Sequence, residues 1–176
     1  GSDILFQSTS NIDINAPVTT SGISTLTINA IGNINDGSNG SFTGKIVSNK
    51  LLLSGSGNVN LDSNTNNISI FSAGTSGSRV GNLLFLNNGA FSVGSVGSNN
   101  GIFTSGTIYI ASLSGDLSIS QNINTQNTST SALILNAGQS TSAGTSNGGN
   151  INFSGGASIT LGTNGRASLY SGSVSG

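Results

Sequence analysis

Short apolar–polar–apolar triplets recur along the whole chain, and this repeat limits the possible folds more than any other feature. Ile12-Asp13-Ile14 is one example. Alternation over three to five residues is the period of a β-strand with one buried and one exposed face. No segment has the i, i+3, i+4, i+7 spacing of an amphipathic helix, and Gly, Asn and Ser interrupt the chain every few residues. The sequence therefore predicts an all-β protein.

The triplets come in pairs with a constant offset, and this offset predicts the architecture. Eight residues separate the starts of the pairs Ile4 and Ile12, Leu26 and Ile34, Leu51 and Val59, and Leu83 and Phe91. Pairs start at residues 4, 26, 51, 83, 108 and 133, mostly 22 to 25 residues apart, and the longer interval from 51 to 83 holds one additional strand around Ile68. Repeats of this length made only of strands favour a β-helix. We therefore expect a right-handed parallel β-helix (β-solenoid) of about seven coils.

The turns leave one competing fold open. Five Asn-Gly dipeptides, such as Asn100-Gly101, are typical of tight antiparallel hairpins, so a hairpin sandwich competes with the solenoid. The constant offset and the scarcity of strands longer than five residues favour the solenoid. In that fold we expect the following side chains to point inward in apolar columns: Leu26, Ile28, Leu51, Leu53, Ile68, Ile70, Ile108, Ile110, Leu133 and Leu135.

Composition excludes several classes of function. Ser (34), Gly (27) and Asn (25) make up about half of the 176 residues, and charged residues are 5%, against about 25% in an ordinary domain. The chain has no His, Cys, Met, Trp or Glu, so the usual catalytic bases and metal ligands reduce to five scattered aspartates. Four basic residues form no patch for nucleic acid, and no apolar run is long enough to insert into a membrane. We expect no catalytic, cofactor-binding or metal-binding residues.

Specific sites have simpler structural explanations. The segment from Asp62 to Asn67 resembles the start of a calcium loop, but Asn67 stands where such loops have Gly and no Glu closes it, so an Asn-rich turn explains it better. Some β-helices are polysaccharide-degrading enzymes, yet no two aspartates align convincingly here, although Asp3 and Asp13 could lie close together. An ice-binding solenoid would repeat its Thr residues in successive coils, and this chain does not.

Several apolar residues fall on the outward phase of the strands or beside it. They are Leu52, one of Leu84 and Phe85, Phe103 and Tyr109. If they align, they form an interaction surface, and if the inserted segments cover them, they are part of the packing. Both alternatives stay open at this point.

The repeats resemble those of a known family. Residues 12–20, 26–35 and 133–138 are similar to repeats of filamentous haemagglutinin-type exoproteins, the large adhesins that Gram-negative bacteria secrete by two-partner secretion. The resemblance is clearest over residues 10–35 and 105–160, and residues 36–50 and 71–107 depart from it. It implies a right-handed parallel β-helix, display on the bacterial surface and a role in cell adhesion.

These observations lead to two functional hypotheses. We expect residues 3–176 to be one β-solenoid segment of a longer repeat protein, after a cloning remnant at residues 1–2, and to serve as a structural or adhesive rod on the bacterial surface. The alternative is a module that binds a host glycan or surface protein through the inserted loops 36–48, 73–82 and 138–150. Strand edges near residues 4–6 and 167–170 predict end-to-end stacking of a mainly monomeric protein.

Overall fold

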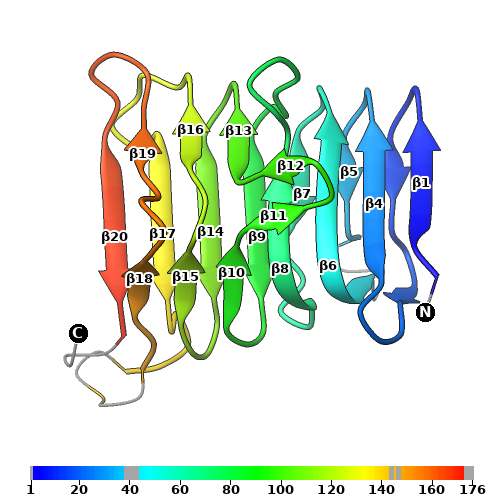
Figure 1. The fold of residues 1–176 in the computed structure, drawn as a ribbon, viewed down its shortest axis with the longest axis horizontal. Coiled ribbons are helices and arrows are strands. Elements are labelled where there is room, and N and C mark those ends of the chain that lie inside the picture. The colour runs from blue at the N-terminus through cyan, green and yellow to red at the C-terminus, as the bar shows by residue number, and fades with distance from the viewer. Residues whose placement is uncertain (1, 38–43, 143–144, 146–147, 173–176) are drawn as a thin grey trace.

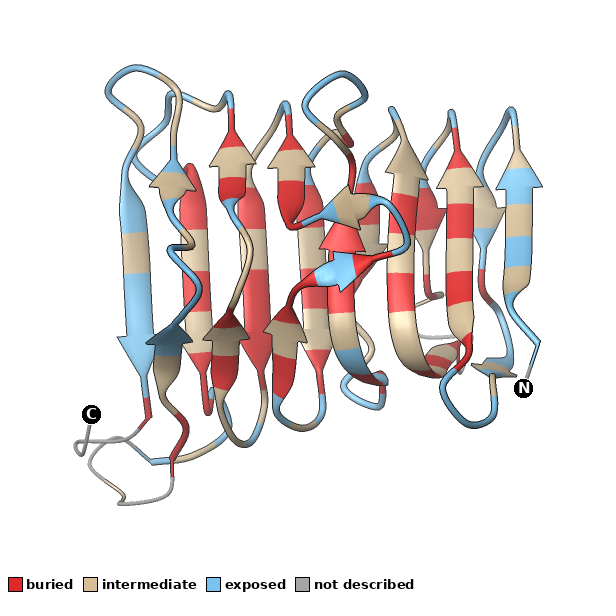
Figure 2. Ribbon diagram, viewed as in Figure 1, coloured by how far each residue is buried: buried red, intermediate tan, exposed pale blue. Residues whose placement is uncertain are grey.

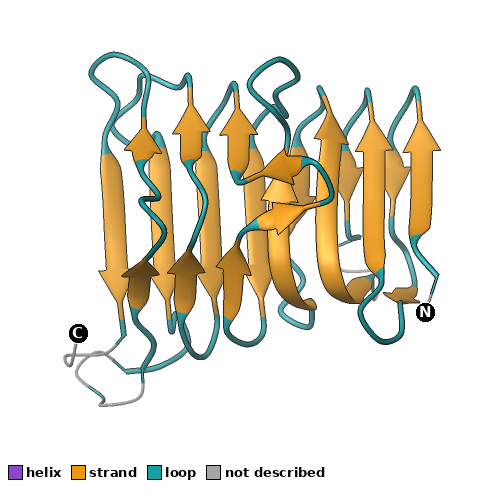
Figure 3. Cartoon of the chain, viewed as in Figure 1, coloured by secondary structure: helices purple, strands orange, loops and turns teal. Residues whose placement is uncertain are grey.

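The chain winds as a parallel β-solenoid. The computed structural model describes residues 2–37, 44–142, 145 and 148–172, and these contain strands and turns but no helix (Figure 3). In Figure 1 the front strands run upward, those behind run downward, and the chain advances from right to left, which is a right-handed winding. The predicted fold class is therefore confirmed.

The described part of the chain contains twenty strands. Their bounds are β1 (Ile4–Ser8), β2 (Ile12–Asp13), β3 (Pro17–Thr19), β4 (Thr25–Ala30), β5 (Ile34–Asn35), β6 (Lys45–Gly55), β7 (Val59–Leu61), β8 (Asn67–Ala73), β9 (Leu83–Asn87), β10 (Phe91–Val93), β11 (Ser95–Val96), β12 (Asn99–Asn100), β13 (Ile102–Thr104), β14 (Ile108–Ser112), β15 (Leu117–Ile119), β16 (Ile123–Thr125), β17 (Leu133–Ala137), β18 (Ile151–Phe153), β19 (Ile159–Thr160) and β20 (Ala167–Ser171).

Two parallel sheets face each other across the core. We call the sheet with the path β1-β4-β6-β8-β10-β15-β18 sheet A; β3, β13, β16 and β19 extend it around a corner. Sheet B has the order β2-β5-β7-β9-β14-β17-β20. The first and last strands of each path have a neighbour on one side only, so about five turns are fully stacked, slightly fewer than the predicted seven coils.

The strand register explains the repeat and corrects one detail of it. On sheet B the equivalent residues Ile12, Ile34, Val59, Leu83, Ile108 and Leu133 are 22 to 25 residues apart. Leu51 belongs to sheet A, where it pairs with Leu26 and Phe71, whereas Leu83 belongs to sheet B. The longer interval from 51 to 83 therefore joins residues of two different sheets. The strand around Ile68 is not additional, because it is the sheet A strand of its coil.

The core consists of stacked inward side chains, seen as alternating buried bands in Figure 2. Nine of the ten predicted inward residues are at most 1% exposed, and each contributes about 1.5–3 kcal/mol through burial. Ile70 is the exception: sheet A turns a corner within β8 after Ser69, so Ile70 is half-buried and Phe71 points inward instead. Phe71 stacks on Phe85 with ring centroids 4.6 Å apart, and Phe91 meets Phe85 edge-on.

One hydrogen bond recurs at the residue just before a strand, and we call the set the Asx ladder. A side-chain Oδ1 in one coil accepts the backbone N–H of the equivalent residue in the next coil. For example, Asn58 Oδ1 accepts from Asn82 N–H at 2.8 Å, and Asn82 Oδ1 accepts from Thr107 N–H at 2.9 Å. The other acceptors with their donors are Asp3 with Thr25, Asn11 with Asn33, Asn33 with Asn58, Asp116 with Asn150, and Asn122 with Ser158. Each such bond joins two coils at a corner.

Residues 71–107, which depart from the repeat, contain the one antiparallel pairing among the described strands. Here β11 and β12 form a hairpin that lies across the outer side of β8 in Figure 1. Val96 of the hairpin is fully buried, and Ser72 beneath it donates to Gly101 O at 2.8 Å. The two strands are joined at Gly97 and Ser98, whereas Asn100-Gly101 lies at the open end of the hairpin, so the Asn-Gly signal did not mark this turn.

Candidate functional site

Sheet B presents an apolar strip on its outer side. Leu84, Tyr109 and Ile134 are register partners on β9, β14 and β17, and all three point outward, half-buried. Leu86 and Ala111 are the register partners two residues further along, but Ala111 is 0% exposed, so the strip does not continue there. Of the two alternatives in the sequence, Leu84 is the outward residue, because Phe85 is fully buried. Of the two alternatives that the sequence left open, alignment holds for Leu84 and Tyr109.

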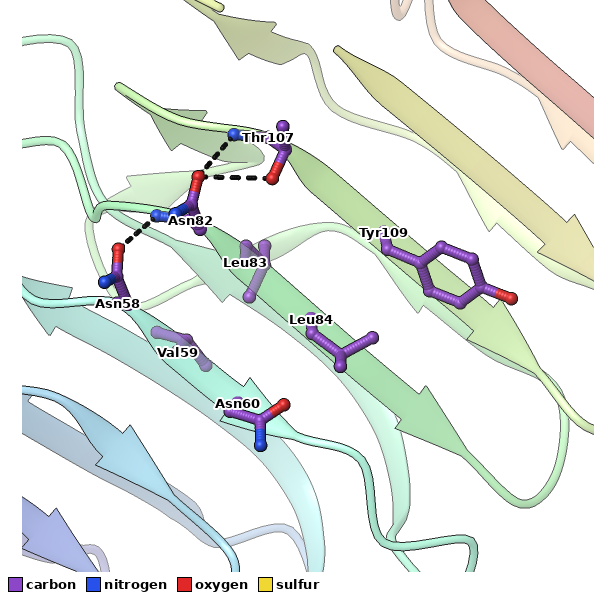
Figure 4. A pocket seen from close by; sticks show the side chains of 8 residues that line it. All are labelled: Asn58, Val59, Asn60, Asn82, Leu83, Leu84, Thr107 and Tyr109. Atoms are coloured by element: carbon purple, nitrogen blue, oxygen red, sulfur yellow. Dashed lines mark hydrogen bonds between the residues drawn. The ribbon is translucent and has the colours of Figure 1, made fainter. Parts of the chain in front are cut away.

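An open depression of about 560 Å³ lies beside this strip. Figure 4 shows Asn58, Asn82 and Thr107 in line at one end of the strands, with Leu84 and Tyr109 further along. The complete lining is Asn58, Val59, Asn60, Asn82, Leu83, Leu84, Thr107 and Tyr109. It combines one aromatic ring and aliphatic carbon with amide and hydroxyl groups, and it holds no charged residue. Such a surface suits a neutral ligand that has both apolar and hydroxyl faces.

Phe103 takes part in packing. The Arg79 guanidinium carbon lies 5.6 Å from the centre of the Phe103 ring, and its Nη1 donates to Asn124 Oδ1 at 2.7 Å and to Thr104 O at 3.1 Å. Arg79 therefore attaches the loop before β9 to two later coils. A smaller depression of about 200 Å³ remains between this loop and the hairpin, next to Phe103.

The other expected surface features have mixed outcomes. Leu52 points outward on β6, half-buried, where the β11–β12 hairpin also packs against that strand. The described loop 73–82 closes on itself through hydrogen bonds between Thr75 and Ser78. The inserted loops 36–48 and 138–150 fall partly outside the described residues. The only outward apolar group that stays together as a strip is therefore the one on sheet B, within the part of the chain that the structure describes.

Two carboxyl groups meet at the corner that follows β5 and β7. Asp36 is 1% exposed, and its Oδ2 accepts from Ser63 N–H at 2.8 Å and from Asn66 Nδ2 at 3.0 Å. Oδ1 of Asp36 and Oδ1 of Asp62 are both buried and have no hydrogen-bond donor among the described residues. Burial raises the pKa of Asp36; the hydrogen bonds from Ser63 and Asn66 oppose this shift, and the neighbouring Asp62 adds to it.

The remaining aspartates have structural roles. Asp3 and Asp116 belong to the Asx ladder, and Asp13 Oδ1 accepts from Asn35 Nδ2 at 2.7 Å. Asp3 and Asp13 thus each bond to the next coil at different positions. Among the described residues, no group of three or more Asp, Glu, His or Cys gathers in one place.

Sequence reasoning missed the pairing of Asp36 with Asp62. It examined the loop from Asp62 to Asn67 by itself, and within that loop Ser63 and Thr65 do bond to each other as an ordinary turn does. The second carboxylate comes from the preceding coil, 26 residues earlier in the chain. The signal that could have located it is the coil period itself, which is close to this spacing.

Comparisons with protein-family models, with curated proteins and with solved structures give no significant match for this chain. Within the described residues there is also no helix of the length and apolar character that crossing a bilayer requires.

Proposed function

We propose that this chain is an adhesive rod segment of a secreted bacterial surface exoprotein, and that the outer side of sheet B is its contact face. The observation that carries the proposal is the apolar strip of Leu84, Tyr109 and Ile134 beside the uncharged depression. Outward positions of a solenoid strand are normally polar, and the earlier coils follow this rule with Asn35 and Asn60 at the equivalent positions. The three adjacent apolar residues therefore distinguish this part of the face from the earlier coils, as expected for an interaction surface.

The chemistry of the depression suggests a neutral glycan as the ligand. The Tyr109 ring can pack against the C–H face of a sugar, and amide groups can bond to its hydroxyl groups. The Oδ1 atoms of Asn58 and Asn82 already accept ladder hydrogen bonds. Their Nδ2 groups are the donors that can serve a ligand. The resemblance of the repeats to filamentous haemagglutinin-type exoproteins supports display on the bacterial surface, with no catalytic role.

The experiment is binding of the intact chain to a glycan array and to host matrix proteins. We expect a neutral glycan to bind, and we expect Y109S and L84S to weaken that binding at least tenfold. L5S is the matched control, because Leu5 is an equally apolar outward residue, 60% exposed, on sheet A. Equal binding by Y109S, L84S and L5S would refute the sheet B face as the contact surface.

A second function, that of a passive shaft, is favoured by the regular steps of 22 to 25 residues between equivalent positions from Ile12 to Leu133. Such a shaft would hold another module away from the cell and bind nothing itself. Absence of binding to every glycan and matrix protein would favour the shaft over the adhesive face.

A further inference from the structure

Four exposed asparagine side chains form a straight row on the outer side of sheet B. Each stands just before a strand of this sheet, and the strand register places all four at equivalent positions of successive coils. We call them the amide row, and its members are Asn11, Asn33, Asn58 and Asn82. At about 4.8 Å per coil the row extends about 14 Å along the solenoid. Figure 4 shows its last two members in line with Thr107, which holds the same position before β14.

The amide of each row member has a fixed orientation. Its Oδ1 accepts a backbone N–H of the next coil, as in the bonds from Asn33 N–H to Asn11 at 2.9 Å and from Asn58 N–H to Asn33 at 3.1 Å. Glycines make room for these side chains, because a Cβ at Gly32 would collide with Asn11 Oδ1 and a Cβ at Gly81 would collide with Asn58 Oδ1. Among the described residues, nothing accepts a hydrogen bond from the Nδ2 group of any row member. The row therefore presents donors that are oriented before a ligand arrives, which lowers the entropic cost of binding.

The amide row continues into the contact face proposed above. Asn82 and Leu84 are two residues apart and lie on the same outer side, since Leu83 between them is buried. Thr107 and Tyr109 repeat this arrangement in the next coil. A ligand that follows the row thus reaches the Tyr109 ring at one end. From the first row member to the coil of Tyr109 the distance is about 19 Å, which is several times the length of one sugar unit.

The charges on this face disfavour an acidic ligand. The strands β2, β5, β7, β9 and β14 contain no Lys or Arg. Asp13 is exposed on β2, where its Oδ1 accepts from Asn35 Nδ2 at 2.7 Å, and the half-buried Asp62 directly follows β7. Their negative charges would repel the carboxylate or sulfate groups of an acidic glycan. The ligand that fits this face is therefore uncharged.

We propose that the amide row binds a linear, uncharged polysaccharide that lies extended along the solenoid axis and contacts several coils at once. This inference rests on the proposed function, because Leu84 and Tyr109 hold one end of the same ligand. A straight row of donors fits an extended chain of the cellulose type better than a branched or coiled one. The Nδ2 groups donate to hydroxyl and ring oxygens of successive sugar units, and the Tyr109 ring packs against a C–H face. The affinity therefore grows with the length of the glycan.

The test is calorimetric titration of the intact chain with cellobiose, cellotetraose and cellohexaose, which are three lengths of one uncharged, extended glycan. We expect the affinity to rise at least tenfold from cellobiose to cellohexaose. N11A and N33A should each weaken cellohexaose binding about threefold to tenfold, the effect of one net hydrogen bond. The loss should be larger for cellohexaose than for cellobiose, because both residues lie outside the depression. N122A is the matched control, because Asn122 is an exposed member of the Asx ladder that precedes β16 of sheet A.

The outcomes separate this inference from the proposed function. If the affinity does not rise with chain length, or if N11A and N33A bind cellohexaose as N122A does, the amide row takes no part in binding. Weaker binding by Y109S would in that case leave the contact face of the proposed function standing. If Y109S and L84S also bind as the unchanged chain does, the proposed function fails as well. Absence of binding by all three glycans, or tighter binding of hexagalacturonic acid than of cellohexaose, would overturn the choice of an uncharged, extended ligand.

Discussion

Replacing Asn87 with Ala removes a buried amide whose contacts are almost all with backbone groups. Asn87 is 0% exposed; its Oδ1 accepts from Ile68 N–H at 2.8 Å, and its Nδ2 donates to Ile68 O at 3.2 Å and to Gly89 O at 2.8 Å. Both groups of Ile68 lie in the core, because Ile68 is 1% exposed. Each buried group left without a partner costs about 1–3 kcal/mol. We therefore expect N87A to lower the free energy of unfolding by about 2–5 kcal/mol.

Asn82 provides the matched comparison. It also makes hydrogen bonds to a neighbouring coil, accepting from Thr107 N–H and Thr107 Oγ1, but it is exposed, so water can replace these bonds. N82A should cost about 0.5–1.5 kcal/mol. Urea unfolding followed by far-UV circular dichroism measures the free energy of unfolding of both variants. The two values can be compared if m, the slope of that free energy against urea concentration, is unchanged. A loss for N87A no larger than that for N82A would refute the role assigned to the buried amide.

Three further predictions concern other parts of the molecule. G55A should lower the melting temperature strongly, because Gly55 has φ +102° and an added Cβ would collide with the carbonyl oxygen of Ala30 in the neighbouring coil. G77A is the control and should leave the melting temperature unchanged, because a Cβ at Gly77 meets nothing within 4 Å. L169K should abolish concentration-dependent association in sedimentation velocity, because Leu169 lies on the inward phase yet is 46% exposed on β20, the last described strand of sheet B; unchanged association would place the contact on the side of the rod. In buffer without divalent cations, the free energy of unfolding should fall as the pH rises from about 4, the ordinary pKa of Asp. The reason is that the raised pKa of Asp36 makes the folded state bind its proton more tightly than the unfolded chain does. This decline should be absent in D36N.

The fold could be predicted from the sequence because its main signal is local and repeated. Each inward position recurs once per coil, so Leu26, Leu51, Ile108 and Leu133 are recognisable as core without any knowledge of their partners. The prediction went wrong at Ile70, since alternation along a strand gives no sign of a corner. At such a corner the phase shifts by one residue.

The candidate sites were less accessible to prediction, because they depend on contacts between coils. Outward Leu84 and Tyr109 could be proposed from phase alone, but their alignment with Ile134 required the register. The pair of Asp36 and Asp62 required both the register and the burial of the corner. The sequence of one repeat does not show which residues of the next repeat lie beside it.

The hydrogen bonds of the Asx ladder all have the same direction along the solenoid. In every one of its bonds the acceptor side chain lies in the earlier coil and the N–H donor in the later one, as from Asn33 to Asn58 to Asn82. A coil that has already folded therefore presents oriented acceptors to the residues that come next in the chain. Folding that begins at the N-terminal coil has a template for each new turn, whereas folding from the other end has none of these acceptors in place. A chain that emerges from its N-terminus onward, from a ribosome or through a pore, could thus fold one coil at a time as it appears.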